Sequence, residues 1–555
     1  MLKSWMNLGC LCVALVAASP MFGSGPYTIG SANTVTADPL VPRPNTTPCV
    51  VQLFSNAAFY NFNIENFTYA PPANCPGPWA KVVLSADINV TPGIQYDRTA
   101  KFWLGPYNIF FGTTAEPGQS NGPAWHIESD LTESSAIFST AQTGVADIGN
   151  TLCCGLTSTI YASAQLEFYP LAAGQNAPKV ADAVLPLSGG PSGGTVTLNT
   201  STDTLAGTFT FPTNVVKAYL DIYSQSQSGD EFWYTCVPSD VAGELFSCGN
   251  TGFRETEVTI DGQPAGVAPV SPWIFTGGID PYLWFPLPGA QALNFVPMRV
   301  DLTPFAGLLS NGQQHTVSLS VFNANGYFED TATLLLYTDH GAAQVTGGVM
   351  RNTLAGAPVP VVAENLVVGN TITGSVKVSS NRQYTISGYV NTSAGRVTTR
   401  VNRTIGFVNA QYFNITSTKY VQDIHLTSKV ASRTTLWRGT AQPVEHDEDL
   451  QFPLTLNISQ ITQSNGNINQ TTSSHQTFVD SVRGGRPGNT FFSLTSNDAQ
   501  QTDTLVFDSS FNLLGNQNQS SSLVYVYGDS VGRTYYCGLA AANNALTSYS
   551  PTCAK

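Results

Sequence analysis

The segment Trp79-Ala80-Lys81-Val82-Val83-Leu84-Ser85-Ala86-Asp87-Ile88 decides the fold class of this 555-residue chain. Every second residue from Val82 to Ile88 is apolar, and a period of two is typical of a half-buried β-strand. Similar segments, rich in Val, Ile, Thr, Phe and Tyr, recur between Gly, Pro and Asn turns. They are residues 100–111, 160–169, 215–224, 255–260, 316–323 and 331–338. Long amphipathic helical patterns do not accompany them, so we predict an all-β fold of β-sandwiches or jelly rolls.

Two changes of character divide these strands into blocks. Residues 171–200 contain the run Gly189-Gly190-Pro191-Ser192-Gly193-Gly194, which predicts a flexible loop. From about residue 346 the chain becomes rich in Ser, Thr and Asn but keeps the strand pattern, as in 375–378, 384–390 and 523–527. We therefore predict a signal peptide (1–24), a linker (25–47), two jelly-roll domains (48–175 and 195–345) and a β-rich C-terminal domain (346–555).

Charge is scarce in this chain. Asp, Glu, Lys and Arg make up 11% of the residues, against about 25% in an average soluble domain. The net charge of -13 and the lack of a Lys/Arg cluster argue against a nucleic-acid partner. A protein that depends little on carboxylate salt bridges loses little stability when acid protonates them, so we expect acid tolerance.

The N-terminus has the features of a secretory signal. Lys3 is followed by an apolar stretch from Leu8 to Ala18 and by the small-residue run Ala17-Ala18-Ser19. The apolar stretch is too short to span a membrane, and later segments do not reach spanning length. We expect an exported protein, secreted or periplasmic, with no membrane contact once the signal is removed.

The cysteine count agrees with export. Cys10 and Cys12 leave with the signal, and an even number remains, which favours disulfides. Local pairing would join Cys49 to Cys75, Cys236 to Cys248 and Cys537 to Cys553. The adjacent Cys153 and Cys154 would then form a vicinal bridge or bond elsewhere, and spacing does not decide between these. A zinc site is not expected, because no CxxC pair or nearby histidine set accompanies them.

Two acidic turns are the first candidates for chemistry. Gln95-Tyr96-Asp97-Arg98 places a carboxylate beside a guanidinium just before a strand, which suits general acid/base work. Gly229-Asp230-Glu231-Phe232-Trp233-Tyr234 places two acids beside three aromatic rings, which suits sugar binding. The alternatives are an ordinary Asp–Arg turn pair and a hairpin tip closed by a disulfide.

Aromatic residues gather in the segment 273–284, where Trp273, Tyr282 and Trp284 could wall a carbohydrate cleft. The pair Gly277-Gly278 within it would allow close approach of the backbone. The alternative is an aromatic core loop. His126, which follows Trp125, could act as a base, and the alternative is a buried or surface role.

Several blocks in this order resemble the secreted peptide:N-glycanases of the plant and fungal PNGase A type. They lie within residues 48–340 and comprise 95–98 with 103–105, 114–117, 230–234, 252–255 and 274–284. The resemblance implies an amidase that hydrolyses the bond between asparagine and the innermost N-acetylglucosamine of an N-glycan. Asparagine becomes aspartate, the glycan leaves as a glycosylamine, and neither a metal nor another cofactor is needed.

A weaker similarity reaches the PNGase F type, which has two eight-stranded jelly rolls. Its catalytic aspartate matches Asp97 and its essential glutamate matches Glu231. The nearest match to its third acid, a glutamate there, is Asp147. The resemblance thus implies a catalytic unit formed by the first two β domains.

The resemblance and the two acidic turns imply the same catalytic residues. Asp97 would activate the attacking water or protonate the leaving group, and Arg98 would set its orientation. Glu231 would bind and polarise the glycan–asparagine core, with Asp147 assisting. The further substrate-binding candidates are Tyr96, Glu116, Trp125, Asp230, Trp233, Arg254, Asp280 and Trp284.

The expected partners are N-glycopeptides and N-glycoproteins, and we expect a monomer. Two other functions fit an exported β-protein with exposed aromatics. One is a non-catalytic lectin-like protein, and the other is a glycosidase that cuts within the glycan by means of two carboxylates.

Overall fold

The computed structural model describes residues 27–486 and 489–553, so the predicted signal peptide lies outside the described residues. Antiparallel strands dominate this part of the chain, joined by turns, short 3₁₀ segments and one short helix, α1 (Ala306–Leu309). The predicted all-β fold is confirmed. No helix in the described part is long and apolar enough to cross a membrane.

The N-terminal part of the chain forms two four-stranded sheets, which we call the first unit. One sheet has the order β1 (Cys49–Phe59), β8 (Ile160–Pro170), β3 (Trp79–Val90), β6 (Ala124–Asp130). The other has the order β2 (Ile64–Tyr69), β7 (Gln142–Ile148), β4 (Thr99–Leu104), β5 (Tyr107–Thr113). Alternate residues of both sheets fill the space between them, and Phe54 of β1 meets Phe102 of β4 edge to face with ring centres 5.2 Å apart.

The middle of the chain, residues 183–338, forms a second pair of sheets, the second unit. One has the order β10 (Val196–Leu198), β17 (Tyr327–Thr338), β12 (Val215–Gln227), β15 (Met298–Asp301), with β9 (Ala183–Leu187) also beside β17. The other has the order β11 (Leu205–Thr210), β16 (Gln314–Phe322), β13 (Glu255–Ile260), β14 (Gln263–Pro269).

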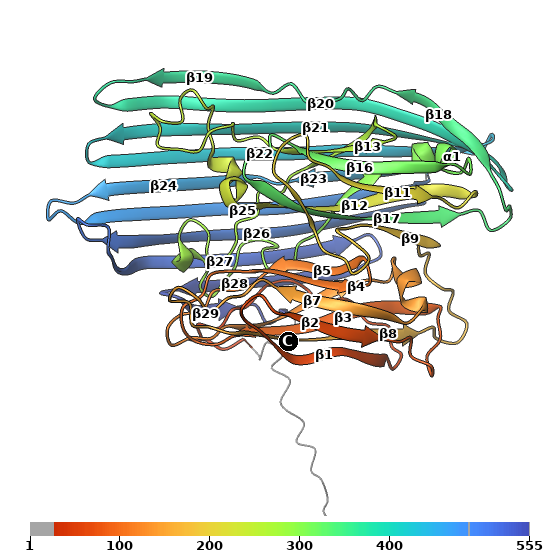
Figure 1. The fold of residues 1–555 in the computed structure, drawn as a ribbon, viewed down its shortest axis with the longest axis horizontal. Coiled ribbons are helices and arrows are strands. Elements are labelled where there is room, and N and C mark those ends of the chain that lie inside the picture. The colour runs from red at the N-terminus through yellow and green to blue at the C-terminus, as the bar shows by residue number, and fades with distance from the viewer. Residues whose placement is uncertain (1–26, 487–488, 554–555) are drawn as a thin grey trace, which may run out of the picture.

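The C-terminal part forms one twelve-stranded sheet, the large sheet, whose strands reach 22 residues. Figure 1 shows its long strands stacked from β19 at the top to β28 and β29, which lie beside the first unit. The order is β18 (Thr346–Asn352), β20 (Ile372–Thr392), β21 (Gly395–Thr416), β22 (Lys419–Arg438), β23 (Val444–Gln451), β25 (Ile468–Arg486), β26 (Asn489–Phe507), β27 (Leu513–Asp529), β28 (Thr534–Ala542), β29 (Ala545–Tyr549). β19 (Val361–Val367) pairs with β20, and β24 (Leu454–Thr462) pairs with β22 and β25.

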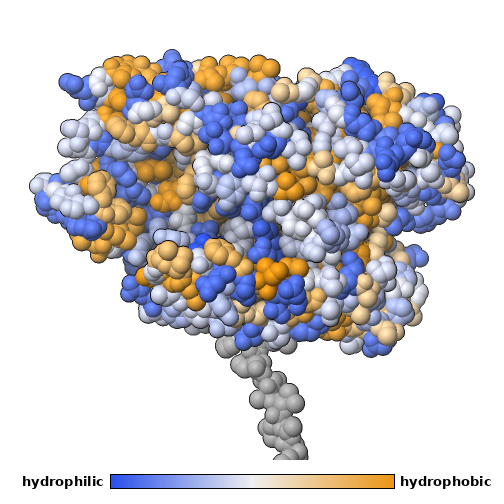
Figure 2. Space-filling view, in the orientation of Figure 1, coloured by the Kyte–Doolittle hydropathy of each residue, from blue (hydrophilic) through white to orange (hydrophobic). Residues whose placement is uncertain are grey.

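The second unit and the large sheet share one hydrophobic core. Phe407 of β21 packs against Phe253 and Trp233, with ring centres 4.9 and 6.0 Å away. The outer surface is mixed in character: Figure 2 shows hydrophilic and hydrophobic residues interspersed over the visible face, with a hollow between the first unit and the overhanging strands of the large sheet.

Amide side chains of the large sheet hold the loops of the second unit. Asn409 Nδ2 donates to the Tyr234 carbonyl (2.8 Å), and Gln411 Nε2 donates to the Cys236 carbonyl (2.8 Å). Gln476 donates to the Pro272 carbonyl (2.8 Å), and its Oε1 accepts the amide of Ala290 (3.1 Å). Because these amides are buried, their hydrogen bonds fix the loops that carry the predicted site residues.

The predicted strand over 100–111 is wrong in one respect. A turn at Gly105 and Pro106 divides it into the hairpin β4–β5. The apolar residues on both sides of this turn made the segment look like one continuous strand. The predicted loop 171–200 contains the short strands β9 and β10, and the segments 375–378 and 384–390 belong to the single strand β20. The domain boundaries themselves stay predictions.

Two of the predicted disulfides, Cys236–Cys248 and Cys537–Cys553, are present. The remaining cysteines of the described residues are thiols in this structure. Cys49 and Cys75 are neighbours, while Cys153 and Cys154 are exposed on a loop of the first unit. Burial, and after it the Cys49 thiol, raises the pKa of Cys75 to about 11. Pairing of these four residues stays a prediction.

Candidate active site

The hairpin β4–β5 brings the first acidic turn beside a second acid. Thr99 pairs with Thr113, so the residues just before β4 lie next to those just after β5. The amide of Asp97 donates to Glu116 Oε1 (3.1 Å), and Thr114 binds the backbone of the next residue in the turn. Asp97 and Glu116 therefore form a pair of partly buried carboxyl groups at one end of the first unit.

Glu231 joins this pair from the second unit. It lies just beyond β12, on the turn that begins with the 3₁₀ segment η2 (Ser228–Asp230). The amides of Gln225 and Gln227 on β12 both donate to Thr99 Oγ1, over 3.1 and 3.3 Å, and so fix β12 against the start of β4. Glu231 is then close enough to Asp97 for the charge of Asp97 to raise its pKa.

Gly277 closes the group. The hydroxyl of Thr276 donates to the Thr114 carbonyl (2.7 Å), which anchors the loop of the second unit on the first. A Cβ atom on Gly277 would lie 2.5 Å from Asp97 Oδ1 and closer still to Glu116 Oε1. A methyl group there would force both carboxyls to move, and the amide of Gly277 donates a hydrogen bond to Asp97. We call Asp97, Glu116 and Glu231 the carboxyl cluster.

Burial raises the pKa values of all three carboxyls, and repulsion by neighbouring carboxylates adds to the rise for Glu116 and Glu231. Burial raises the pKa of Asp97 to about 6, although hydrogen bonds from backbone amides and the charge of Arg98 oppose the rise. Burial first and the charge of Asp97 second raise the pKa of Glu231 to about 7 and that of Glu116 to about 8. Near neutral pH the cluster thus holds both an ionised carboxylate and a protonated carboxyl, the two forms that acid–base catalysis needs.

A row of polar residues continues the site along β4, β7 and β17. Lys101 Nζ binds Glu329 Oε2 at 2.7 Å and lies 3.7 Å from Asp147 Oδ2. Tyr327 connects this row to the cluster, because the charges of both Glu329 and Glu231 act on its hydroxyl and, after burial, raise its pKa. The third predicted acid, Asp147, thus lies on this row with Lys101 and Glu329 as its partners.

Arg98 and Tyr96 lie at the edge of the cluster. Arg98 Nη2 donates to Gln95 Oε1 (2.5 Å), and its guanidinium is 5.8 Å from the centre of the Tyr96 ring. Among the described residues no ion pair joins Arg98 to Asp97, so Arg98 acts on Asp97 through its charge and the turn geometry. The ring of Tyr96 is 60% exposed and available to a ligand.

Asp230 and Arg254 are structural residues, contrary to the prediction. Their side chains are fully buried and form an ion pair. Arg254 Nε and Nη2 both donate to Asp230 Oδ1, over 2.9 and 2.6 Å. Asp230 Oδ2 accepts two backbone amides, those of Asn325 and Gly326 (2.7 Å each). The predicted pair of adjacent acids is therefore divided: Asp230 points into the protein and anchors the turn, and Glu231 points to the cluster.

The predicted aromatic lining is also corrected. Trp233 is 1% exposed and packs on Phe407 in the shared core, and Trp284 is buried with its Nε1 donating to the Gly278 carbonyl (2.9 Å). Asp280 is buried as well, and it accepts the amide of Tyr282 (3.0 Å) at the start of η4 (Pro281–Trp284). These residues shape the loop behind Gly277 and do not line the site. Trp125 lies elsewhere, on β6 beside a separate cavity.

The residues that sequence reasoning missed are Thr99, Lys101, Gln225, Gln227, Tyr327 and Glu329. Each lies on a strand whose alternation directs it to the junction between the two units. The available signals were Lys101 in the apolar strand β4 and Glu329 in β17. Whether these two side chains meet depends on how the two units pack together.

The site so described is a cluster of partly buried carboxyls at the junction of two β units, equipped for acid–base chemistry. The family model described as peptide N-acetyl-beta-D-glucosaminyl asparaginase amidase A matches residues 39–350, more than half of the chain. This chain belongs to that family.

A similar curated protein is the peptide-N4-(N-acetyl-beta-glucosaminyl)asparagine amidase A of Prunus dulcis, 28% identical over 379 residues. The match covers 64% of this chain and 65% of that protein, so the chain spans slightly less than two thirds of its relative.

Two solved structures are similar over 53% of this chain. PNGase F of Flavobacterium meningosepticum is 16% identical with a TM-score of 0.37, and 96% of it is covered. PNGF-II is 12% identical with a TM-score of 0.36, and 66% of it is covered.

We predict that Gly277→Ala reduces catalytic activity at least 100-fold while the protein still folds. The added methyl group must displace the carboxyls of Asp97 and Glu116, and a displacement of about 1 Å can cost that much. Gly243→Ala is the matched control, because a Cβ there meets no atom within 4 Å. Activity on a glycopeptide and the melting temperature of both variants are measured. Wild-type activity in Gly277→Ala contradicts the role given to the cluster.

Proposed function

We propose that this protein is a peptide:N-glycanase, an amidase that hydrolyses the bond between asparagine and the innermost N-acetylglucosamine of an N-glycan. The observation that carries the proposal is the carboxyl cluster of Asp97, Glu116 and Glu231 around Gly277. Membership of the amidase A family supports it.

In this proposal Asp97 is the general base. It has the lowest pKa of the three carboxyls, about 6, so it is the one ionised near neutral pH. It accepts a proton from a water molecule, whose oxygen attacks the amide carbon of the glycosylated asparagine. The tetrahedral intermediate then collapses, the carbon–nitrogen bond breaks, and the peptide keeps an aspartate.

Glu231 is the proton donor. Its pKa of about 7 keeps a large share of it protonated at neutral pH, and it faces Asp97 from the other unit. The proton goes to the leaving nitrogen, so the glycan departs as a neutral glycosylamine. Asp97 and Glu231 together then supply both proton transfers.

Glu116 is a positioning residue. It accepts the amide of Asp97 (3.1 Å), and its pKa of about 8 keeps it neutral while Asp97 is ionised. A neutral neighbour spares Asp97 a second negative charge, whereas an ionised one would raise the pKa of Asp97 further. Glu116 thereby helps to hold Asp97 in its basic form.

The polar row and Tyr96 supply the substrate-binding surface in this proposal. N-glycopeptides and N-glycoproteins are the proposed substrates. Lys101, Asp147 and Glu329 offer both donors and acceptors for sugar hydroxyls, and the exposed Tyr96 ring offers an apolar face. No observation favours the lectin-like alternative.

We predict that Asp97→Asn lowers glycan release about 10²–10⁴-fold, the usual contribution of a general base. In the assay the protein digests a denatured glycopeptide in H₂¹⁸O, and the mass of the peptide product is measured by mass spectrometry. An amidase leaves aspartate that carries one ¹⁸O, whereas a glycosidase that cuts within the glycan leaves N-acetylglucosamine on the peptide.

Asp240→Asn is the control, because Asp240 is exposed on a separate turn of the second unit. It should release glycan at the wild-type rate. Near-wild-type turnover by Asp97→Asn, or a wild-type product without ¹⁸O in the aspartate, sinks the proposal.

We also infer that the protein is exported and that it acts as a monomer. The N-terminal pattern from Lys3 to Ser19 and the two disulfides support export. N-terminal sequencing of the protein recovered outside the cell should start near residue 25, and an intact Met1 there would contradict the signal. Light scattering checks the monomer.

Acid tolerance follows from the raised pKa values. Burial, first among the causes, raises the pKa values of seven carboxyls to between about 6 and 8. They are Asp38, Asp97, Glu116, Glu231, Glu255, Asp280 and Asp480. A carboxyl with a higher pKa in the folded than in the unfolded state favours folding at low pH, and loses that contribution as pH rises through the folded-state pKa.

We therefore predict a higher melting temperature at pH 5 than at pH 8 at constant ionic strength. Carboxyls with lowered pKa values, such as Glu128 at about 2, lose their contribution to stability only as pH falls below the unfolded-state value of 4.5, so at pH 5 they oppose this trend only weakly. Scanning calorimetry checks it, and a melting temperature that rises from pH 5 to pH 8 would contradict it.

A further inference from the structure

A cavity of about 540 Å³ lies away from the carboxyl cluster, between the N-terminal segment, the first unit and the large sheet. Residues 34–40 cover one side of it, β6 and the loop 291–296 form the walls, and β25, β26 and β27 contribute the floor. Its size is within the range of small-molecule sites. The mechanism proposed above uses none of its residues.

The floor is built by strand alternation. Phe478 of β25 pairs with Asn497 of β26, which pairs with Tyr525 of β27. Two residues further along, Asp480 pairs with Thr495. Paired residues and residues two apart share a face, so these five side chains lie together on one face of the large sheet.

Two acceptor atoms on this floor are buried and have no partner. They are Asn497 Oδ1 and Asp480 Oδ1, and Asn497 is 3% exposed. Buried polar atoms normally have a hydrogen-bond partner, so an unpartnered pair in a cavity indicates a missing ligand or solvent. Asn497 Nδ2, for its part, points to Asp38 Oδ1 at 3.5 Å.

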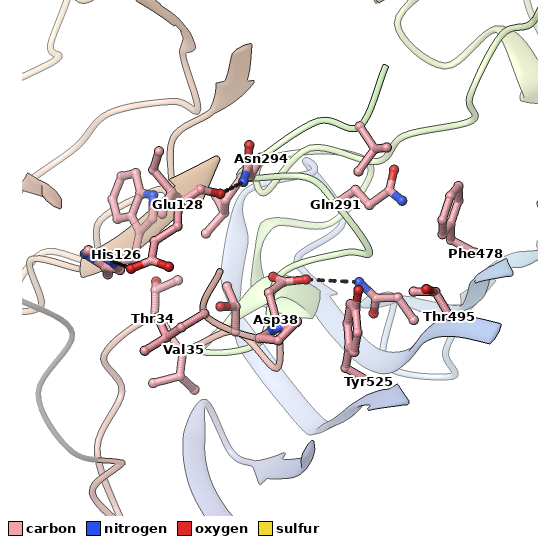
Figure 3. Close-up of a pocket in the computed structure, with 18 of the residues that line it drawn as sticks. Thr34, Val35, Asp38, His126, Glu128, Gln291, Asn294, Phe478, Thr495 and Tyr525 are labelled. Carbon is pink, nitrogen blue, oxygen red and sulfur yellow. Dashed lines mark hydrogen bonds and ion pairs between the residues drawn. The ribbon is translucent and has the colours of Figure 1, made fainter. Parts of the chain in front are cut away.

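The opposite wall offers donors. Gln291 Oε1 accepts the indole NH of Trp273 (3.4 Å), which leaves the NH₂ group of Gln291 for other partners. The indole NH of Trp125 is buried without a partner. Figure 3 shows Gln291 across an open space from Asp38, Tyr525 and Thr495.

The acidic groups of the lining disfavour anionic ligands. Asp38 and Asp480 have no cationic partner among the described residues, whereas Glu128 is already bound by Arg43 and by His126 (3.1 Å), which also binds Asp87 (2.8 Å). The ligand must therefore bring donors and acceptors without negative charge, together with an apolar face for the rings of Tyr525 and Phe478.

We propose that this cavity is a second saccharide-binding site, which takes one or two neutral sugar rings. A sugar hydroxyl both donates and accepts, so it can serve Asn497 Oδ1 and Asp480 Oδ1 on the floor and the Gln291 amide on the wall. The C–H face of the ring packs on the aromatic side chains. The proposal stands independently of the amidase activity, because it shares no residue with the carboxyl cluster.

Calorimetric titration of the full-length Asp97→Asn protein tests the site. The probes are mannobiose, glucose, glucosamine and glucuronate. We expect mannobiose and glucose to bind and glucuronate not to bind. Binding of glucosamine alone would identify an ammonium site and overturn the proposal, as would the absence of binding by both neutral sugars.

Two variants in the same background locate the binding. Asn497→Leu removes the amide from the floor, and Gln291→Ala, in a loop, removes the donor from the wall with less risk to folding. Each should weaken mannobiose binding at least tenfold. Ser496→Ala, at the neighbouring position of β26 whose side chain points to the other face, is the control and should bind as its parent does. Unchanged binding in Gln291→Ala and in a folded Asn497→Leu would overturn the assignment.

Discussion

The removal of water from three carboxyl groups at one junction is the constraint on which the rest of this structure depends. Asp97 and Glu116 come from the first unit, Glu231 from the second, and Gly277 fills the space between them. Among the described residues no cation forms an ion pair with any of the three, so burial raises their pKa values, and neighbouring carboxylates raise those of Glu116 and Glu231 further. Near neutral pH the junction thus holds a carboxylate and a protonated carboxyl side by side, whereas carboxyls exposed on an ordinary surface would all be ionised.

Keeping like charges together requires a rigid frame, and the large sheet supplies it. Its buried amides Asn409, Gln411 and Gln476 hold the backbone of the two loops that carry Glu231 and Gly277. The buried pair of Asp230 and Arg254 fixes the turn from within. In this arrangement the large sheet stabilises the site and contributes none of the three carboxyls.

Strand alternation predicted the fold class and much of the first unit. The pattern of 79–88 corresponds to β3, and Asp97 and Glu231 were recognisable as charges in a charge-poor chain. The residue pattern by itself did not distinguish Glu231 from Asp230, and the catalytic role of Glu231 came from the family resemblance. The structural role of Asp230 was hidden because its partner, Arg254, lies 24 residues away. Trp233 and Trp284 likewise look like ligand-stacking rings in sequence, but tertiary packing places them in the core. Lys101 and Glu329 are 228 residues apart, and only the docking of the two units brings them together.

In the proposed reaction ionised Asp97 and protonated Glu231 act together, and the pH dependence of kcat/KM on a glycopeptide tests this pairing most directly. We expect a bell-shaped profile: activity rises as Asp97 ionises near pH 6 and falls as Glu231 loses its proton near pH 7. In Glu231→Gln the residual activity should lose the descending limb. A wild-type rate that climbs without a maximum to pH 9 would show that protonated Glu231 is not required.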